Sequence, residues 1–213
     1  MNILLIEPFF KGSHKQWANQ LKLHSKHEIE FLTIDTAGWK WSMQAGTIHL
    51  ANQFNKKNYS PDLILATDML DTATFLSLTF PFEKRPPVAI YFHENQLAYP
   101  WTSHDGKIAE KIRMNYAMIN VKSALTADKL YFNSSYNKSS FIKNAKEFFK
   151  NYRGISIEND IDKIEQKSDI LPLGIKLKKF DEYKDDSIEA SPSIPLILWN
   201  HRWEYDKNPD SFF

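Results

Sequence analysis

Short apolar segments alternate with segments of helical periodicity along most of this chain, and this alternation is the feature that most constrains its fold. The β-prone runs occupy residues 2–7, 28–34, 62–67, 88–92 and 129–133. The segments between them, at residues 13–25, 41–55, 71–80 and 107–126, have the pattern of helices. Strands that alternate with helices are typical of a parallel sheet with crossover helices. We therefore predict an α/β fold.

The domain organisation follows from the rest of the chain. A lysine-rich segment of helical character spans residues 135–166, and a short strand at the start of 168–175 ends in a proline-glycine turn, so we expect the first domain to end at residue 177. Residues 178–193 are charged and bounded by proline, as an exposed linker is. Residues 194–213 restart the pattern with a strand of buried type and with Asn208-Pro209, a helix N-cap followed by proline. We expect a second domain that begins here and is truncated.

Composition excludes several classes of site. The chain has 213 residues, 27 basic and 26 acidic side chains, and no cysteine. Its net charge of +1 does not indicate a global nucleic-acid-binding field, and the absence of cysteine removes disulfides and thiolate chemistry. No signal peptide is apparent, and no apolar run approaches the roughly 20 residues that span a bilayer. We expect a cytoplasmic protein with no membrane partner.

Polar residues follow four of the predicted strands at the point where each strand ends. Carboxyl ends of parallel strands meet at one edge of a sheet, where open α/β proteins bind their ligands. We therefore predict a functional cleft that contains Gly12, Ser13, His14, Asp68, His93, Glu94, Asn95, Gln96, Asn133 and Ser134.

Two of these clusters admit both a functional and a structural interpretation. The Gly12-Ser13-His14 turn precedes a helix, whose N-terminus suits an anion such as phosphate, but an ordinary connection capped by Ser13 has the same pattern. His93 and Glu94 can exchange protons or hold sugar hydroxyls, whereas His93 alone can equally be a structural histidine.

Two enzyme classes lack their motifs. The HENQL segment, residues 93–97, begins like a zinc H-E-x-x-H motif but lacks the second histidine, so no metal is expected. The G-x-S-x-G turn of serine hydrolases is absent.

Two sets of cations are candidates for binding anions. Arg202 and Lys207 follow the first strand of the second domain, where a guanidinium and an ammonium can converge on a diphosphate, unless both are solvated surface charges. The lysine-rich segment can present a basic helical face that guides RNA, or a solvated face, through Lys138, Lys143, Lys146, Lys150 and Arg153.

Five segments together resemble a known family. These are IEPFFKGSHKQ, ATDMLD, YFHENQLAYPW, FNSSYNKSSF and WNHRWEYDKNP, in this order along the chain. They resemble the glycosyltransferase-like family that includes tRNA-queuosine α-mannosyltransferase, which is similar to retaining glycosyltransferases of the GT-B type with two Rossmann-like domains.

The resemblance implies a function and a role for each group. It implies transfer of mannose from GDP-mannose to the queuosine nucleoside of a tRNA, with retention, without a cofactor or metal. Within it, the Gly12 loop faces the donor diphosphate, and His93 and Glu94 lie at the sugar and acceptor. Arg202 and Lys207 neutralise the leaving diphosphate, while Asp68, Asn95, Gln96, Asn133 and Ser134 are left as contacts of the sugar or acceptor. Lys11 stands where the family commonly has a second glycine, so this loop approaches the ligand less closely or Lys11 itself reaches a phosphate.

The sequence leaves two alternatives open. The acceptor could instead be a glycan, a lipid or a small molecule, or the chain could be a non-catalytic nucleotide-binding or RNA-binding module. Because the family holds its donor mainly in the second domain, we expect this chain alone to be inactive.

Overall fold

The computed structural model describes residues 1–35, 38–57, 59–81, 84–100, 106–150, 152, 154, 156–183, 197–203 and 207–213, with the side chains of the helix that starts at residue 106 described from residue 112 on. The chain divides into two units, Met1–Leu173 and Gly174–Phe213. Residues 184–193 of the predicted linker, and Arg153 of the lysine-rich segment, lie outside the described residues.

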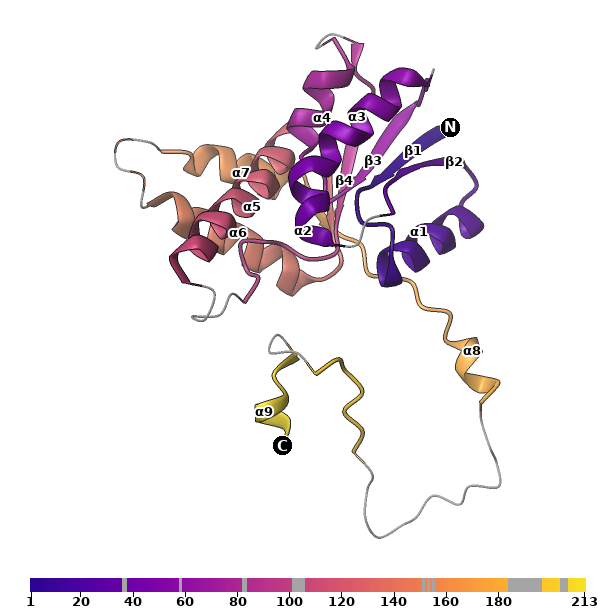
Figure 1. Ribbon diagram of the computed structural model, residues 1–213, viewed down its shortest axis with the longest axis vertical. Helices are drawn as coiled ribbons and strands as arrows, with labels where there is room; N and C mark the ends of the chain where they lie inside the picture. The colour runs from indigo at the N-terminus through magenta and orange to yellow at the C-terminus, as the bar shows by residue number, and fades with distance from the viewer. Residues whose placement is uncertain are drawn as a thin grey trace. The chain divides into compact units, whose positions relative to one another are not determined.

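The first unit is built on a six-stranded parallel sheet in the order β2-β1-β3-β4-β5-β6 (Figure 1). Its strands are β1 (Asn2–Glu7), β2 (Glu28–Thr33), β3 (Leu63–Thr67), β4 (Val88–Phe92), β5 (Lys129–Phe132) and β6 (Ser168–Ile170). All five neighbouring pairs are parallel. The predicted α/β fold, with a Rossmann-like sheet, is confirmed, and each predicted strand of the first domain is present.

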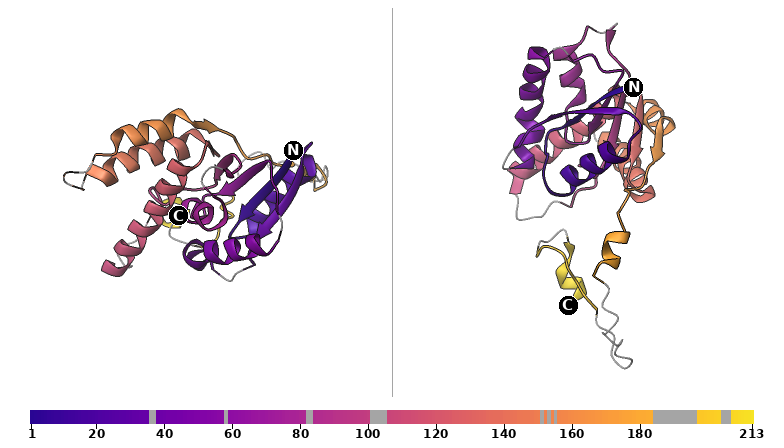
Figure 2. Two further views of the ribbon diagram at one scale, coloured as in Figure 1. Left: turned by 90° about the horizontal axis from the view of Figure 1, so that it is seen from above. Right: turned by 90° about the vertical axis from the view of Figure 1, so that its right-hand side faces the viewer.

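Helices connect the strands. They are α1 (Gly12–His24), α2 (Trp39–Trp41), the π-helix η1 (Ser42–Gly46), α3 (Thr47–Lys56), α4 (Thr72–Thr79), α5 (Gly106–Thr126), α6 (Ser135–Lys150) and α7 (Glu158–Gln166). The helix predicted at residues 41–55 is thus three joined pieces, because a π-turn interrupts it. Both views agree that α5, α6 and α7 pack together (Figures 1 and 2).

Alternate residues of β1 are buried in two different hydrophobic cores, one on each face of the sheet. Leu4 and Ile6 of β1 join the larger core, to which α3, α4, α5, α6 and α7 contribute apolar side chains. Ile3 and Leu5 pack instead with Ala18 of α1. The period-2 alternation of a strand explains this division, since helices cover both faces of the sheet. α1 and the pair α3 and α4 lie on opposite sides of it (Figure 1).

The turn from β1 into α1 differs from the expected one. The helix begins at Gly12, its N-cap is Lys11, and no side chain caps it, so Ser13 is not the cap. Gly12 has a φ of +49°. Glycine adopts this left-handed conformation without the steric cost that a Cβ would bring, which explains glycine at this position.

The described residues of the second unit form two short helices, α8 (Lys178–Asp181) and α9 (Pro209–Phe212). Asn208 is the N-cap of α9 and proline follows in its first turn, as predicted. The strand predicted at the start of residues 194–213 is wrong for its described part, because residues 197–200 form no strand, and Ile197 and Leu198 are exposed. A strand needs a neighbour to take its backbone hydrogen bonds, and the described residues offer it none.

No helix in the described part of the chain is long and apolar enough to cross a membrane.

Candidate functional site

The carboxyl ends of β1, β3 and β4 bring together acidic and imidazole side chains from segments far apart in the sequence. Glu7 ends β1 and is fully buried. Its Oε1 accepts the backbone N–H of Phe9 at 2.9 Å, and its Oε2 lies 2.9 Å from Nδ1 of His14 in α1. The turn after β1 therefore serves to bring His14 back onto the last residue of the strand.

His14 and His93 lie side by side but differ in charge. Their ring centroids are 4.3 Å apart. Burial lowers the pKa of His14, but the hydrogen bond and the negative charge of Glu7 outweigh it, so the pKa is raised overall. Burial, assisted by the charge of His14, lowers the pKa of His93 to about 3. Near neutral pH the pair thus combines a ring that favours a positive charge with a neutral ring that retains a lone pair.

Asp68, directly after β3, supplies a third group with altered acidity. Its Oδ1 accepts the backbone N–H of His93 at 2.9 Å, which joins the ends of β3 and β4. Complete burial raises the pKa of Asp68 to about 8, although the charge of His14 opposes the shift. The side chain is therefore largely protonated at neutral pH and can donate a hydrogen bond.

An aromatic wall encloses His93. Trp17 of α1 stacks on Tyr91 of β4 with a centroid distance of 4.7 Å, and it forms a T-shaped pair with His93, with the ring centroids 4.6 Å apart. Tyr91 is itself fixed by a 2.9 Å hydrogen bond from its hydroxyl to the Leu171 carbonyl. The wall explains the desolvation of the His93 ring.

Asn95, Asn133 and Ser134 hold the loop that carries His93. Asn133 donates to the His93 carbonyl at 2.6 Å, and Ser134 donates to Oδ1 of Asn133. Asn137 of α6 accepts from Asn95 at 2.7 Å and donates to Asn133 at 3.0 Å. These bonds make the amides a rigid support, and their predicted contacts with sugar or acceptor remain a prediction.

Glu94 and Gln96 are joined to Asp68 through α5. Nε2 of Gln96 donates to Glu94 at 3.3 Å, while its backbone N–H donates to Asn120 at 2.8 Å. Asn120 in turn donates to the Asp68 carbonyl at 2.9 Å. The buried Asn120 thus fixes the segments after β3 and β4 relative to each other.

Several buried polar atoms in this region have no hydrogen-bond partner among the described residues. They are Oγ1 of Thr67, Oδ2 of Asp68, Oγ1 of Thr72, Nε2 of His93 and the amide oxygen Oε1 of Gln96. Buried polar groups are nearly always paired in folded proteins. A group of unpaired atoms at the carboxyl edge of a parallel sheet is the arrangement expected of a site that binds a polar ligand.

The structure brings His14, Asp68, His93, Glu94 and Gln96 together at this edge of the sheet. Their roles in binding or catalysis remain a prediction. The structure adds Glu7, Trp17, Tyr91 and Asn120, which the sequence analysis did not select. A carboxylate at the end of an apolar strand was the available signal for Glu7, whereas Asn120 lies in a long helix with no local signal.

Glu7, His14 and His93 also have the composition of a metal site, with one ligand atom from each residue lying within 4.8 Å of the others. The direct hydrogen bond between Glu7 and His14 uses Oε2 of Glu7 and Nδ1 of His14. The expectation that no metal binds here remains a prediction.

The remaining predicted residues lie elsewhere. Gly12 and Ser13 are exposed at the start of α1. Lys11 forms a 3.1 Å ion pair with Asp35. Arg202 and Lys207 belong to the second unit, so their convergence on the diphosphate of a donor remains a prediction.

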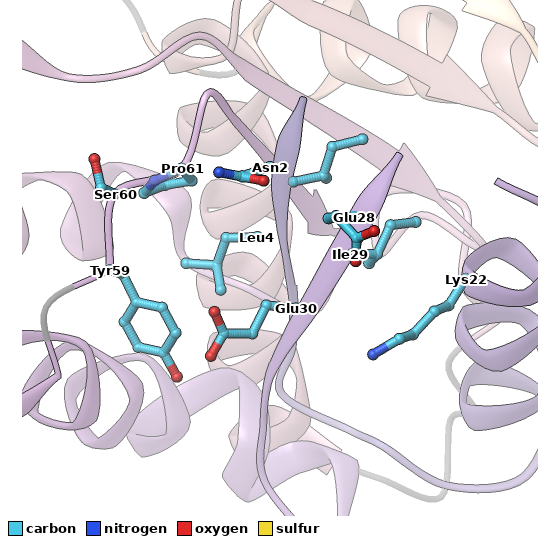
Figure 3. A pocket seen from close by; sticks show the side chains of 10 residues that line it. Asn2, Leu4, Lys22, Glu28, Ile29, Glu30, Tyr59, Ser60 and Pro61 are labelled. Carbon is cyan, nitrogen blue, oxygen red and sulfur yellow. The ribbon is translucent and has the colours of Figure 1, made fainter. Parts of the chain in front are cut away.

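A separate hollow of about 400 Å³ lies at the opposite edge of the sheet (Figure 3). Asn2 and Glu28, which line it, are the first residues of β1 and β2. Open α/β sheets bind ligands at the carboxyl ends of their strands, so this hollow is not the candidate site.

Comparison with known proteins agrees with the resemblance noted in the sequence. Residues 2–175 match the model of the family described as tRNA-queuosine alpha-mannosyltransferase N-terminal. The chain is also 30% identical over 220 residues to the tRNA-queuosine alpha-mannosyltransferase of Drosophila melanogaster, with 98% of this chain and 55% of that protein covered. It therefore spans about half the length of this relative. The chain belongs to the tRNA-queuosine alpha-mannosyltransferase N-terminal family.

Proposed function

We propose that this chain is the acceptor-side part of a glycosyltransferase that moves mannose from GDP-mannose to the queuosine nucleoside of a tRNA, with retention. Family membership and the Drosophila relative support the activity. The observation that carries the site assignment is the set of unpaired buried polar atoms around Asp68, His93 and Gln96. Hydroxyl groups of a sugar and of a nucleoside have both the donors and the acceptors that these atoms lack.

The charge states suit the proposed transfer. The bond from the anomeric carbon to the diphosphate breaks, a bond from that carbon to an acceptor oxygen forms, and the acceptor proton leaves with a diphosphate oxygen. The transition state has oxocarbenium character, and fixed positive charge stabilises the departing anion. In this proposal His14 provides part of that charge, because Glu7 raises its pKa.

His93 acts by orienting a hydroxyl group in this proposal. A ring whose pKa is lowered to about 3 is a weak base near neutral pH but a good hydrogen-bond acceptor through its lone pair. The protonated carboxyl of Asp68 donates to a ligand oxygen from the other side. Asn95, Asn133 and Ser134 keep these groups in place.

The proposal assigns Arg202 and Lys207 to the leaving diphosphate, in place of a metal ion. It places the protein in the cytoplasm, with tRNA and a nucleotide sugar as partners and no membrane partner. No cofactor is required, because the nucleotide sugar is a co-substrate.

Mass spectrometry of tRNA nucleosides from a strain that lacks the gene tests the proposal. Mannosyl-queuosine should disappear and queuosine should accumulate, and the purified full-length protein should restore the modification when given GDP-mannose. Unaltered tRNA nucleosides, together with transfer to a glycan, lipid or small molecule, would assign a different acceptor. Absence of both transfer and donor hydrolysis would leave a binding module.

A further inference from the structure

A tryptophan with most of its surface in solvent lies beside the candidate site. Trp41 ends α2 and is 75% exposed. Its ring makes no ring contact with any residue of the described part of the chain. Tryptophan has a large apolar surface that water solvates poorly, so an indole held in solvent on an ordered helix is a candidate for contact with a partner.

The segment that presents Trp41 is fixed to the core from its other side. Trp39, two residues earlier, packs with Met43, Met69 and Tyr116. Its ring lies 5.5 Å from that of Tyr116. The Tyr116 hydroxyl donates to the Lys40 carbonyl at 3.3 Å. Residues two apart on a helix point in different directions, so the packing of Trp39 leaves Trp41 outside.

The same packing connects Trp41 to the site. Met69, which packs with Trp39, directly follows Asp68. Tyr99 belongs to the segment that begins with His93, and its ring centroid lies 5.9 Å from that of Trp39. The segment before α2 also adjoins the turn after β1, because the Ile34 carbonyl accepts the N–H of Phe10 at 3.3 Å. Trp41 therefore stands at the carboxyl edge of the sheet, among the segments that build the site.

Two exposed cations lie at this edge, Lys15 in the first turn of α1 and Lys40 next to Trp41. Their ammonium groups lie 5.6 Å from the ring centroids of Phe10 and Trp39, respectively. Single-stranded nucleic acids bind where aromatic faces that stack on bases combine with cations that meet the backbone. Alternating aromatic and basic residues occur here in the order Trp39, Lys40, Trp41.

We propose that Trp41 stacks on an unpaired base of the tRNA next to the target nucleoside, with Lys40 at the adjacent phosphate. This inference rests on the proposed function, since it supplies the contact that holds the RNA at the site. It assigns Trp41 to recognition of the RNA and not to binding of the sugar donor.

Binding of queuosine-containing tRNA to the full-length protein, followed by fluorescence anisotropy at fixed salt, tests the proposal. Trp41→Ala should weaken binding by roughly 10- to 100-fold, the range found when one stacking ring is removed. Trp41→Phe should stay within about threefold of the wild type, because any aromatic face stacks on a base. Lys40→Gln should reduce the slope of log Kd against log salt by about 1.

Matched variants separate stacking from loss of surface area or charge. Leu23, an exposed apolar residue near the end of α1, and Lys26 lie at the opposite edge of the sheet. Leu23→Ala and Lys26→Gln should leave tRNA affinity and its salt slope unchanged. The affinity for GDP-mannose should be the same in Trp41→Ala as in the wild type.

Three results would overturn the proposal. One is tRNA affinity in Trp41→Ala within twofold of the wild type, and another is equal weakening by Trp41→Phe and Trp41→Ala. The third is loss of transfer in Trp41→Ala at unchanged tRNA affinity, which would indicate that the ring packs against another part of the protein. Binding of tRNA that depends on Trp41, without any mannosyl transfer, would support this inference while contradicting the proposed function.

Discussion

At the scale of single residues, the site shows how neighbours set the chemistry of identical side chains. His14 and His93 are both largely buried, yet they differ in their carboxylate contacts: the ring of His14 bonds Glu7 through Nδ1, whereas His93 bonds Asp68 through its backbone N–H. The pKa of one is raised and that of the other is lowered. Pairs of titratable groups whose pKa values are shifted in opposite directions by their environments are typical of functional sites.

Replacement of Glu7 by Gln should lower the pKa of His14 relative to the wild type. The substitution removes the Glu7 charge that raises this pKa and leaves the burial that lowers it, although Asp68 and Glu94 still act to raise it. Titration of the His14 ring by NMR measures the change. Glu28→Gln, at the opposite end of the sheet, is the matched control and should leave the pKa of His14 unchanged. An unchanged His14 pKa in Glu7→Gln would mean that Glu7 does not stabilise the positive charge of His14.

Asp68→Asn should make the protein more stable than the wild type at alkaline pH. The pKa of Asp68 is raised to about 8 in the folded protein, so the folded state binds a proton that the unfolded state has lost above about pH 4. Wild-type stability therefore falls as pH rises from about 4 to 8, by at most about 1.4 kcal/mol per pH unit from this group. Urea unfolding at pH 5, 7 and 9 should show a gap between the two proteins that widens and then levels off. A gap that is constant over this range would contradict the prediction.

Arg202→Ala should reduce kcat/KM of the full-length enzyme for mannosyl transfer, at a cost of about 2–4 kcal/mol, comparable to the loss of one oxyanion donor. The reason is that a fixed cation on the leaving diphosphate matters most in the transition state. Steady-state transfer kinetics measure this effect. A kcat/KM within threefold of the wild type would show that Arg202 does not stabilise the leaving diphosphate.

At the scale of elements, α6 carries several lysines that have partners within the protein. Its lysines were one candidate for guiding RNA, but Lys146 forms an ion pair with Asp162 of α7 at 2.8 Å, and Lys150 pairs with Glu147 at 3.1 Å. Lys138 donates to the Ser168 carbonyl at 2.6 Å. These partners favour the alternative in which the helix face is structural or solvated.

Replacement of Lys138, Lys143, Lys146 and Lys150 by Gln should consequently leave the salt dependence of tRNA binding unchanged. Partners within the protein compete with phosphate for three of these four ammonium groups. Anisotropy titrations at several salt concentrations provide the measurement. A slope reduced by two or more would restore α6 as part of the RNA-binding surface.

The elements themselves could be predicted because their patterns are local. Strands such as β4, with five buried residues, are continuous apolar runs between polar segments. The π-turn in η1 has no such pattern, and the strand predicted near Ile197 required a partner strand that local sequence does not supply. In the site, residues that directly follow strands were predictable from topology. Asn120 was not, because its role depends on where α5 packs.

At the scale of the whole molecule, the two units divide the expected substrates between them. The candidate acceptor residues belong to the unit Met1–Leu173, whereas Arg202 and Lys207 belong to Gly174–Phe213. The family resemblance implies that the donor is held mainly by a second domain. The 213-residue chain should therefore bind GDP-mannose with a Kd of roughly 1 mM or weaker, equivalent to about 4 kcal/mol or less.

Calorimetry on the 213-residue chain checks this affinity, with the full-length protein as the comparison. Micromolar affinity of the chain alone, or mannosyl transfer by it, would show that the donor site lies in the first domain.

The order of the strands in the sheet has a consequence for how the site forms during folding. β1 lies between β2 and β3, and the Glu7 and His14 side chains at its end meet His93, which follows β4. The support for the His93 loop comes later still, from Asn133 and Asn137. During synthesis on the ribosome, more than a hundred further residues must therefore be added after Glu7 and His14 before the site can form. Contacts of such long sequence separation form slowly, so we expect assembly of the site to be a late event in folding.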